Sequence, residues 1–143
     1  MTTVRIPLPA GTMAVPAARG FTSDTLRSWR VPDQTREMAE LVVSELVGNA
    51  VEHGGGDAEL ELSLSDGSIR VDVIDHSLQL PILFSPDPVE DRHRGLLIVS
   101  ALSTRWGSDL IGDGKTVWAQ LPCPGMAGQT PGPMGVDDRS LSG

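Results

Sequence analysis

Residues 41–54, LVVSELVGNAVEHG, decide how this 143-residue chain folds and what it can do. Apolar side chains recur through this stretch at the spacing of a largely buried helix. Pro32 and Asp33 supply a helix start, and the glycines at 54–56 supply a strong stop. We therefore expect a helix over Gln34–His53.

Two polar residues, Glu45 and Asn49, interrupt the apolar run of this helix. Side chains at positions i and i+4 project from the same face, about 5–6 Å apart at Cβ. A carboxylate and an amide oxygen placed in this way can hold a hard cation such as Mg²⁺, directly or through water, and can orient an attacking hydroxyl group. A polar stripe on an amphipathic helix would leave the same pattern, so the pair alone does not choose between the two interpretations.

The remaining segments indicate a two-layer α/β sandwich with a mixed, mostly antiparallel sheet and its helices on one face. The clearest of them is a hairpin, because apolar and polar residues alternate on both sides of the turn Asp66-Gly67. In chain order we expect a strand over Thr3–Leu8, helices over Ala14–Val31 and Gln34–His53, strands over Glu59–Leu64 and Ile69–Asp75, a long loop over Ser77–Arg92, a helix from about Gly95 to Ser103, and strands over Arg105–Leu110 and Lys115–Leu121.

The charge of the chain narrows its partners. A formal charge of −8 and a pI near 4.7 disfavour nucleic-acid and membrane-surface roles, because both need a basic field to attract phosphate groups. Nucleotides and proteins are the expected partners.

Composition also suggests a compartment and a domain boundary. The single cysteine, Cys123, can form no internal disulfide, which fits a reducing compartment, and we expect it to be an incidental exposed thiol. The first residues carry neither a signal peptide nor a membrane-spanning run, so the cytoplasm is the expected location. Pro, Gly and Ser dominate after residue 121, which predicts one domain over 1–121 and a disordered tail over 122–143.

Two further features could take part in chemistry. Asp75 ends an apolar strand, where its carboxylate could accept a hydrogen bond from the exocyclic amine that distinguishes adenine. It could equally be the ordinary start of a turn. Gly95 is expected to open a helix after a long loop, where a missing Cβ lets a phosphate approach backbone N–H groups at the positive end of the helix dipole.

The order of these residues resembles the GHKL (Bergerat-fold) ATPase superfamily, which includes gyrase, heat-shock chaperones, histidine kinases and mismatch-repair ATPases. The motifs LVVSELVGNAVEHG, VIDHS, RGLLIV, RWG and GDGKTVWAQL are more closely similar to small ATP-binding proteins of actinobacteria that are related to anti-sigma-factor serine kinases. The resemblance covers about Ala14–Leu121, with five motifs in the right order and at fitting spacing.

The resemblance implies roles for the residues of the long helix. Asn49 would ligate Mg²⁺ that bridges the phosphates of ATP, and Glu45 would act as general base toward a partner's serine hydroxyl. His53, one turn beyond Asn49, would line the nucleotide site. A histidine at a helix end, near the negative pole of the dipole, is an equally good interpretation of His53.

The later motifs would complete the site. Asp75 would read the adenine amine, with Thr116 supporting it through a hydroxyl or a water, and Ser77 belongs to the same expected nucleotide site. Gly95 and the amides of Leu96 and Leu97 would bind phosphate.

By resemblance, the chain would be an ATP-binding regulatory protein with ATP and Mg²⁺ as cofactors. It would act as a serine/threonine kinase that phosphorylates an anti-anti-sigma partner and sequesters a sigma factor, and a homodimer is expected because such relatives are often dimers. Two departures keep a second hypothesis open. No glycine follows Asp75 until Gly95, and His93-Arg94 stand where better-conforming members have a further glycine. The alternative is a catalytically inactive protein-binding module, gated by nucleotide or free of it.

Overall fold

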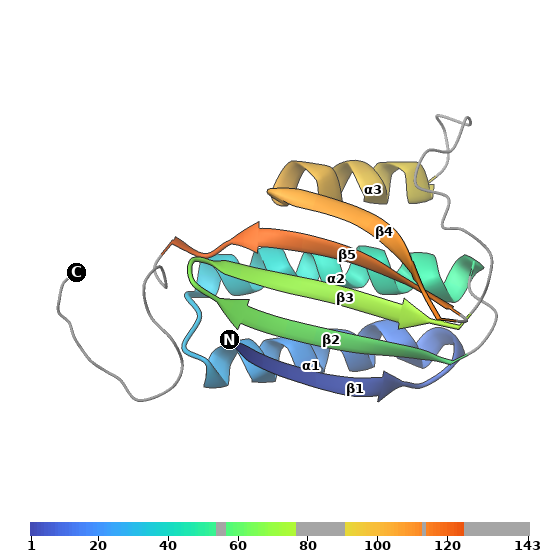
Figure 1. Ribbon diagram of the computed structural model, residues 1–143, viewed down its shortest axis with the longest axis horizontal. Helices are drawn as coiled ribbons and strands as arrows, with labels where there is room; N and C mark the ends of the chain where they lie inside the picture. The colour runs from blue at the N-terminus through green and yellow to red at the C-terminus, as the bar shows by residue number, and fades with distance from the viewer. Residues whose placement is uncertain (54–56, 77–90, 113, 125–143) are drawn as a thin grey trace, which may run out of the picture.

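The computed structural model describes residues 1–53, 57–76, 91–112 and 114–124 (Figure 1). Its elements follow the expected order, with one added turn of 3-10 helix (η1) before the first long helix. They are β1 (Thr2–Leu8), η1 (Gly11–Met13), α1 (Ala14–Ser28), α2 (Asp33–His53), β2 (Ala58–Ser65), β3 (Ser68–Asp75), α3 (Asp91–Leu102), β4 (Arg105–Ile111) and β5 (Gly114–Pro122).

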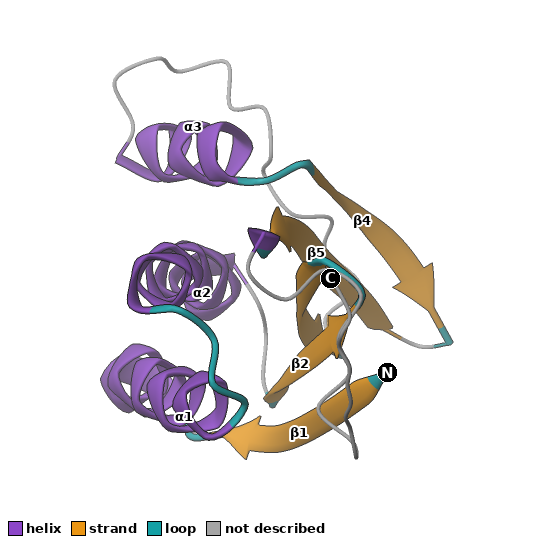
Figure 2. Ribbon diagram, turned by 90° about the vertical axis from the view of Figure 1, so that its left-hand side faces the viewer, coloured by secondary structure: helices purple, strands orange, loops and turns teal. Residues whose placement is uncertain are grey.

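The five strands form one sheet in the order β1-β2-β3-β5-β4, and every neighbouring pair is antiparallel. The three described helices α1, α2 and α3 lie on one face of this sheet, as Figure 2 shows, and none of them covers the opposite face. The predicted two-layer α/β sandwich is therefore confirmed, and its sheet is antiparallel throughout.

The hydrophobic core lies between the helices and the sheet. The central strands supply alternate residues to it, because side chains of a strand alternate between the two faces. The residues that strands β2, β3 and β5 contribute are Leu60, Leu62, Leu64, Ile69, Val71, Val73, Val117, Ala119 and Leu121. Helix α2 contributes Ala39, Val42, Val43, Leu46 and Val47, all at most 1% exposed.

The hairpin between β2 and β3 forms as expected. Ser65 pairs with Ser68, which leaves Asp66 and Gly67 as a two-residue loop. Gly67 has a φ of 70°, the left-handed conformation that such tight turns require and that glycine adopts without a Cβ clash. The carbonyl of Gly67 also accepts a hydrogen bond from the amide of Cys123, at 2.8 Å.

Helix α1 ends at Ser28, three residues before the predicted end at Val31. The amide of Val31 donates to the carbonyl of Leu26 at 2.9 Å, and the amide of Arg30 donates to the carbonyl of Arg27 at 3.0 Å. Arg30 has a φ of 63°. These bonds form a Schellman motif, which caps the helix and turns the chain toward α2 while Val31 and Leu26 stay buried.

The sheet continues past the predicted domain boundary at residue 121. Strand β5 runs to Pro122, and the Cys123 side chain is buried in the core, so the expectation of an exposed thiol is wrong. Cysteine behaves as a small apolar residue, which explains its place there. The rest of the predicted tail, 125–143, lies outside the described residues. In the part of the chain that is described, no helix is both long enough and apolar enough to cross a membrane.

Candidate functional site

The ends of four elements lie on the same side of the molecule. The C-terminal end of α2, the C-terminal end of β3, the first residues of β5 and the start of α3 all lie on the right in Figure 1. Asn49, Asp75 and Lys115 belong to these segments. Residues separated by up to 66 positions in the sequence are thereby brought to the same end of the fold.

Asn49, on α2, has a buried side-chain amide. Both polar atoms of its side-chain amide, Oδ1 and Nδ2, are buried and have no hydrogen-bond partner among the described residues. A buried amide without a partner costs about 1–3 kcal/mol, and such groups in native proteins need an explanation. A ligand that bonds to the amide would supply one.

Glu45 lies one turn before Asn49 on the same helix and is half-buried. The two residues lie along one edge of the apolar stripe that packs α2 on the core, a stripe that includes Val42 and Leu46. Packing of that stripe therefore determines the direction in which both polar side chains project.

The residues present fit a magnesium ion bound together with phosphates. Among the described residues, no group of three or more His, Cys, Asp or Glu side chains gathers as a metal site. A cation at Asn49 would thus take most of its ligands from a nucleotide and from water, which is how Mg²⁺ is commonly held in phosphate-transfer sites. The unpartnered Oδ1 of Asn49 is a suitable oxygen ligand for it.

Asp75 lies at the end of β3 and faces the helix layer, on the same side of the strand as the core residues Val71 and Val73. Its Oδ1 atom accepts a hydrogen bond from Nζ of Lys115, at 3.1 Å, and both side chains are 4% exposed. The two residues are directly opposite in the ladder between β3 and β5. The carboxylate expected to read a base is therefore already one half of a buried ion pair.

Lys115 is not one of the predicted site residues, although the sequence carries a signal for it. Val117, Ala119 and Leu121 alternate along β5 and face the core, and Lys115 falls on the same alternation. A lysine at a core-facing position of a strand requires an acidic partner, because a buried unpaired charge is strongly unfavourable.

Glycine is required at the residue before Lys115. A Cβ on Gly114 would overlap the carbonyl oxygen of Asp75 and approach Cα of His76 to 2.9 Å. The absence of a side chain lets the first residue of β5 pack directly on the last residues of β3.

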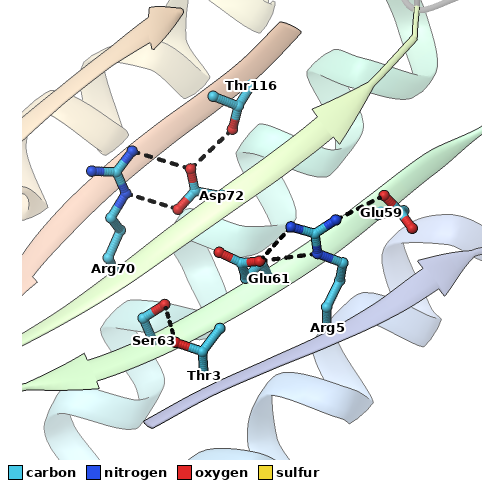
Figure 3. Close-up of polar contacts among 8 residues, drawn as sticks. All are labelled: Thr3, Arg5, Glu59, Glu61, Ser63, Arg70, Asp72 and Thr116. Carbon is cyan, nitrogen blue, oxygen red and sulfur yellow. Dashed lines mark hydrogen bonds and ion pairs between the residues drawn. The ribbon is translucent and has the colours of Figure 1, made fainter. Parts of the chain in front are cut away.

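Thr116 does not lie where the resemblance implied. It faces the side of the sheet that the helices leave open, and its hydroxyl donates to Oδ2 of Asp72 at 3.0 Å (Figure 3). Arg70 donates to the same carboxylate through Nε, at 2.8 Å, and through Nη2, at 3.2 Å. Adjacent residues of a strand point to opposite faces, so Thr116 cannot support Asp75 from this position.

The expected helix start near Gly95 also needs correction. Helix α3 begins at Asp91, not near Gly95, so Gly95, Leu96 and Leu97 lie in its second turn. Unpaired N–H groups belong to the first turn of a helix, and the amides of these three residues are beyond it. The phosphate-binding role of these three residues stays a prediction.

Two predicted site residues are left as predictions. Ser77 lies outside the described residues, and so does the side chain of His53, which is the last residue of α2.

An apolar groove lies beside the last turns of α2. It is lined by residues near the end of β1, the start of α1 and the last turns of α2, among them Leu8, Ala14, Val47 and Val51. None of Glu45, Asn49, Asp75 and Lys115 lines it, although Ala50, the residue after Asn49, does.

Three solved structures share the fold of this chain. The RsbU and RsbW domains of Rv1364c from Mycobacterium tuberculosis align with a TM-score of 0.63 and 21% identity, over 87% of this chain and 34% of that one. The histidine kinase domain of the Erythrobacter litoralis EL346 blue-light activated histidine kinase aligns with a TM-score of 0.52 and 22% identity, over 80% and 64%. The catalytic domain of histidine kinase ThkA aligns with a TM-score of 0.50 and 14% identity, over 87% and 97%.

The chain spans about a third of the first of these structures and under two thirds of the second. No curated protein matches it. A model of the histidine kinase-like ATPase domain, however, matches residues 8–121. This range includes every strand and helix described above except β1, of which only Leu8 falls inside it, and the last residue of β5. This chain belongs to the histidine kinase-like ATPase domain family.

Proposed function

We propose that the chain binds Mg²⁺-ATP at the end of the molecule where α2, β3 and β5 meet, and that it is a protein-serine kinase of the anti-sigma-factor type. It would phosphorylate a serine of an anti-anti-sigma partner and sequester a sigma factor, in the cytoplasm and as a homodimer. The observation that carries the proposal is the buried, unpartnered amide of Asn49, one helical turn from the carboxylate of Glu45.

Mg²⁺ would neutralise charge on the triphosphate, and Oδ1 of Asn49 would be its ligand from the protein. Glu45 would accept the proton of the serine hydroxyl as the serine oxygen bonds to the γ-phosphorus of ATP. The bond from that phosphorus to the β–γ bridging oxygen would break, with ADP as the leaving group. Transfer of a phosphoryl group depends mainly on such positioning and charge neutralisation, so few protein groups are needed.

The acidic character of the chain agrees with protein and nucleotide partners. With a formal charge of −8, a highly charged triphosphate would be repelled unless a cation accompanies it. ATP binding should therefore depend steeply on Mg²⁺.

The kinase proposal is tested by transfer of label from γ-labelled ATP to a candidate anti-anti-sigma protein in the presence of Mg²⁺. Glu45→Gln should bind ATP as the natural chain does and lose transfer by about 100-fold or more, as expected for a general base. Glu37→Gln is a matched control, because Glu37 is an exposed glutamate two turns earlier on the same helix. Tight ATP binding by the natural chain without transfer to any partner serine would defeat the proposal.

A second candidate function is favoured by the ion pair between Lys115 and Asp75. A carboxylate already satisfied inside the chain is consistent with a non-catalytic module that binds a protein partner with or without nucleotide. Under this candidate, a folded Glu45→Ala protein should keep its regulatory effect on the partner, whereas the kinase proposal requires that effect to be lost.

A further inference from the structure

Lys115 and Asp75 face each other where the kinase proposal places the adenine base. Nζ of Lys115 lies 3.1 Å from Oδ1 of Asp75, and each side chain is 4% exposed. Their Cα atoms are register partners in the ladder between β3 and β5. The register of the two strands therefore holds these buried side chains opposite each other.

Two features hold Lys115 at this position. The ladder fixes its backbone opposite Asp75, and Gly114 packs against the backbone of Asp75 and His76 with no room for a side chain. The pair also differs from the ion pair of Arg70 with Asp72 on the open face, where the arginine side chain is 41% exposed and solvent screens the attraction. Burial leaves the attraction between Lys115 and Asp75 much less screened.

The exocyclic amine of adenine would meet this carboxylate at a disadvantage. The amine is a neutral donor, whereas the lysine is a cationic donor, and charge-assisted hydrogen bonds are roughly twice as strong as neutral ones. A carboxylate neutralised by an ammonium group is also a weaker acceptor for a second donor.

We propose that Lys115 competes with the nucleotide base for Asp75, and so determines how tightly and how selectively this chain binds ATP. The inference rests on the proposed function, because it takes Asp75 as the residue that reads the base. In the natural chain Lys115 lowers the affinity for adenine. To bind, the adenine amine of ATP must either share the Asp75 carboxylate with the lysine or displace the lysine from it.

The competition has a consequence for base selection. A base with a carbonyl in place of the 6-amino group, such as hypoxanthine in ITP, has no exocyclic amine to donate to Asp75 but offers an acceptor to the lysine. Lys115 should therefore narrow the preference for ATP over ITP, and its removal should widen it.

The test compares Mg²⁺-ATP, Mg²⁺-ITP and adenosine binding by the natural chain, Lys115→Met and Lys115→Arg, using calorimetry. Methionine fills much the same space without charge, and arginine keeps the charge. Lys115→Met should bind ATP and adenosine about tenfold more tightly and ITP no more tightly. Lys115→Arg should behave as the natural chain does.

Lys115→Met leaves a buried carboxylate without its cation and could fail to fold, which thermal unfolding reports. Lys115→Gln is then the variant to measure, because its neutral amide can still donate to Asp75. It should bind ATP more tightly than the natural chain, by a smaller factor.

The outcomes separate this inference from the kinase proposal. Folded Lys115→Met that binds ATP as tightly as the natural chain, or more weakly, overturns the competition even if the natural chain is an active kinase. If Lys115→Met binds ATP and the natural chain does not, the competition is supported and the kinase proposal for the natural chain is defeated. If neither protein binds ATP, both the competition and the kinase proposal are overturned. If Lys115→Met gains affinity equally for ATP and ITP, the role of Lys115 in base selection is overturned.

Discussion

The hydroxyl of Thr116 donates to Asp72 at 3.0 Å, on the sheet face opposite to the one that carries Asp75. Thr116 and Lys115 are neighbours in the sequence, and yet only Lys115 faces the helix layer. The residue that contacts Asp75 is thus the lysine, and the threonine belongs to the network of Arg70 and Asp72 (Figure 3).

Thr116→Val should leave nucleotide binding unchanged and lower the free energy of unfolding by about 1 kcal/mol, the usual contribution of one hydrogen bond. Valine keeps the β-branched shape that suits a strand. Chemical denaturation and calorimetric titration with Mg²⁺-ATP check the two parts. A folded variant that loses ATP binding would place Thr116 in the nucleotide site after all.

Asn49→Ala should abolish the stabilisation of the fold by Mg²⁺-ATP without lowering the stability of the ligand-free protein. Removing the unpartnered amide removes a burial cost of about 1–3 kcal/mol, which offsets the small cavity that alanine leaves. Thermal unfolding with and without Mg²⁺-ATP measures both effects, because a ligand that binds only the folded state raises its stability.

A purely structural Asn49 predicts the opposite result. In that case the ligand-free Asn49→Ala protein would be clearly less stable, and its response to Mg²⁺-ATP would match that of the natural chain.

Gly114→Ala should lower the free energy of unfolding by about 1–3 kcal/mol or more, because the new Cβ would overlap the backbone of Asp75 and His76. Gly20→Ala is the matched control. Gly20 lies inside α1 with no atom of another element within 4 Å of its Cβ position, so alanine there should stabilise the protein by about 0.5–1 kcal/mol. Urea denaturation measures both, and similar stability of the two variants would contradict the close approach of β5 to β3.

Cys123 should react slowly with thiol reagents in the native protein at neutral pH. Burial raises the pKa of the Cys123 thiol, and the thiolate is the reactive form. Labelling with a chromogenic disulfide in buffer and in denaturant gives the two rates, and this cysteine is the only one in the chain, so the signal is unambiguous. Equal rates would mean that Cys123 is exposed.

The raised pKa of Cys123 also has a consequence for stability. In the folded state the Cys123 thiol keeps its proton to a higher pH than in the unfolded state. Its contribution to the free energy of unfolding is therefore complete below the ordinary thiol pKa of about 8.5 and is lost as the pH rises above that value. When the free energy of unfolding is measured against pH, Cys123→Ala should not show this loss of stability at alkaline pH.

The sequence by itself determined the elements and their layers. Alternation of apolar residues in β2 and β3, the turn at Asp66-Gly67 and the long apolar helix α2 are local patterns, and each has one arrangement that buries its apolar side. The pairing of Glu45 with Asn49 on one face of that helix also follows from spacing alone.

Only the tertiary structure decided which groups meet and which are satisfied. The partner of Asp75 is set by the register of β5 against β3, across 40 residues of chain, and a shift of one residue would have placed Thr116 there instead of Lys115. The buried, unpartnered state of Asn49 and the start of α3 at Asp91 likewise depend on how elements pack and on where the chain first satisfies its backbone. Local patterns specify which face of an element is buried, but contacts between distant segments exist only once the sheet and helices have assembled.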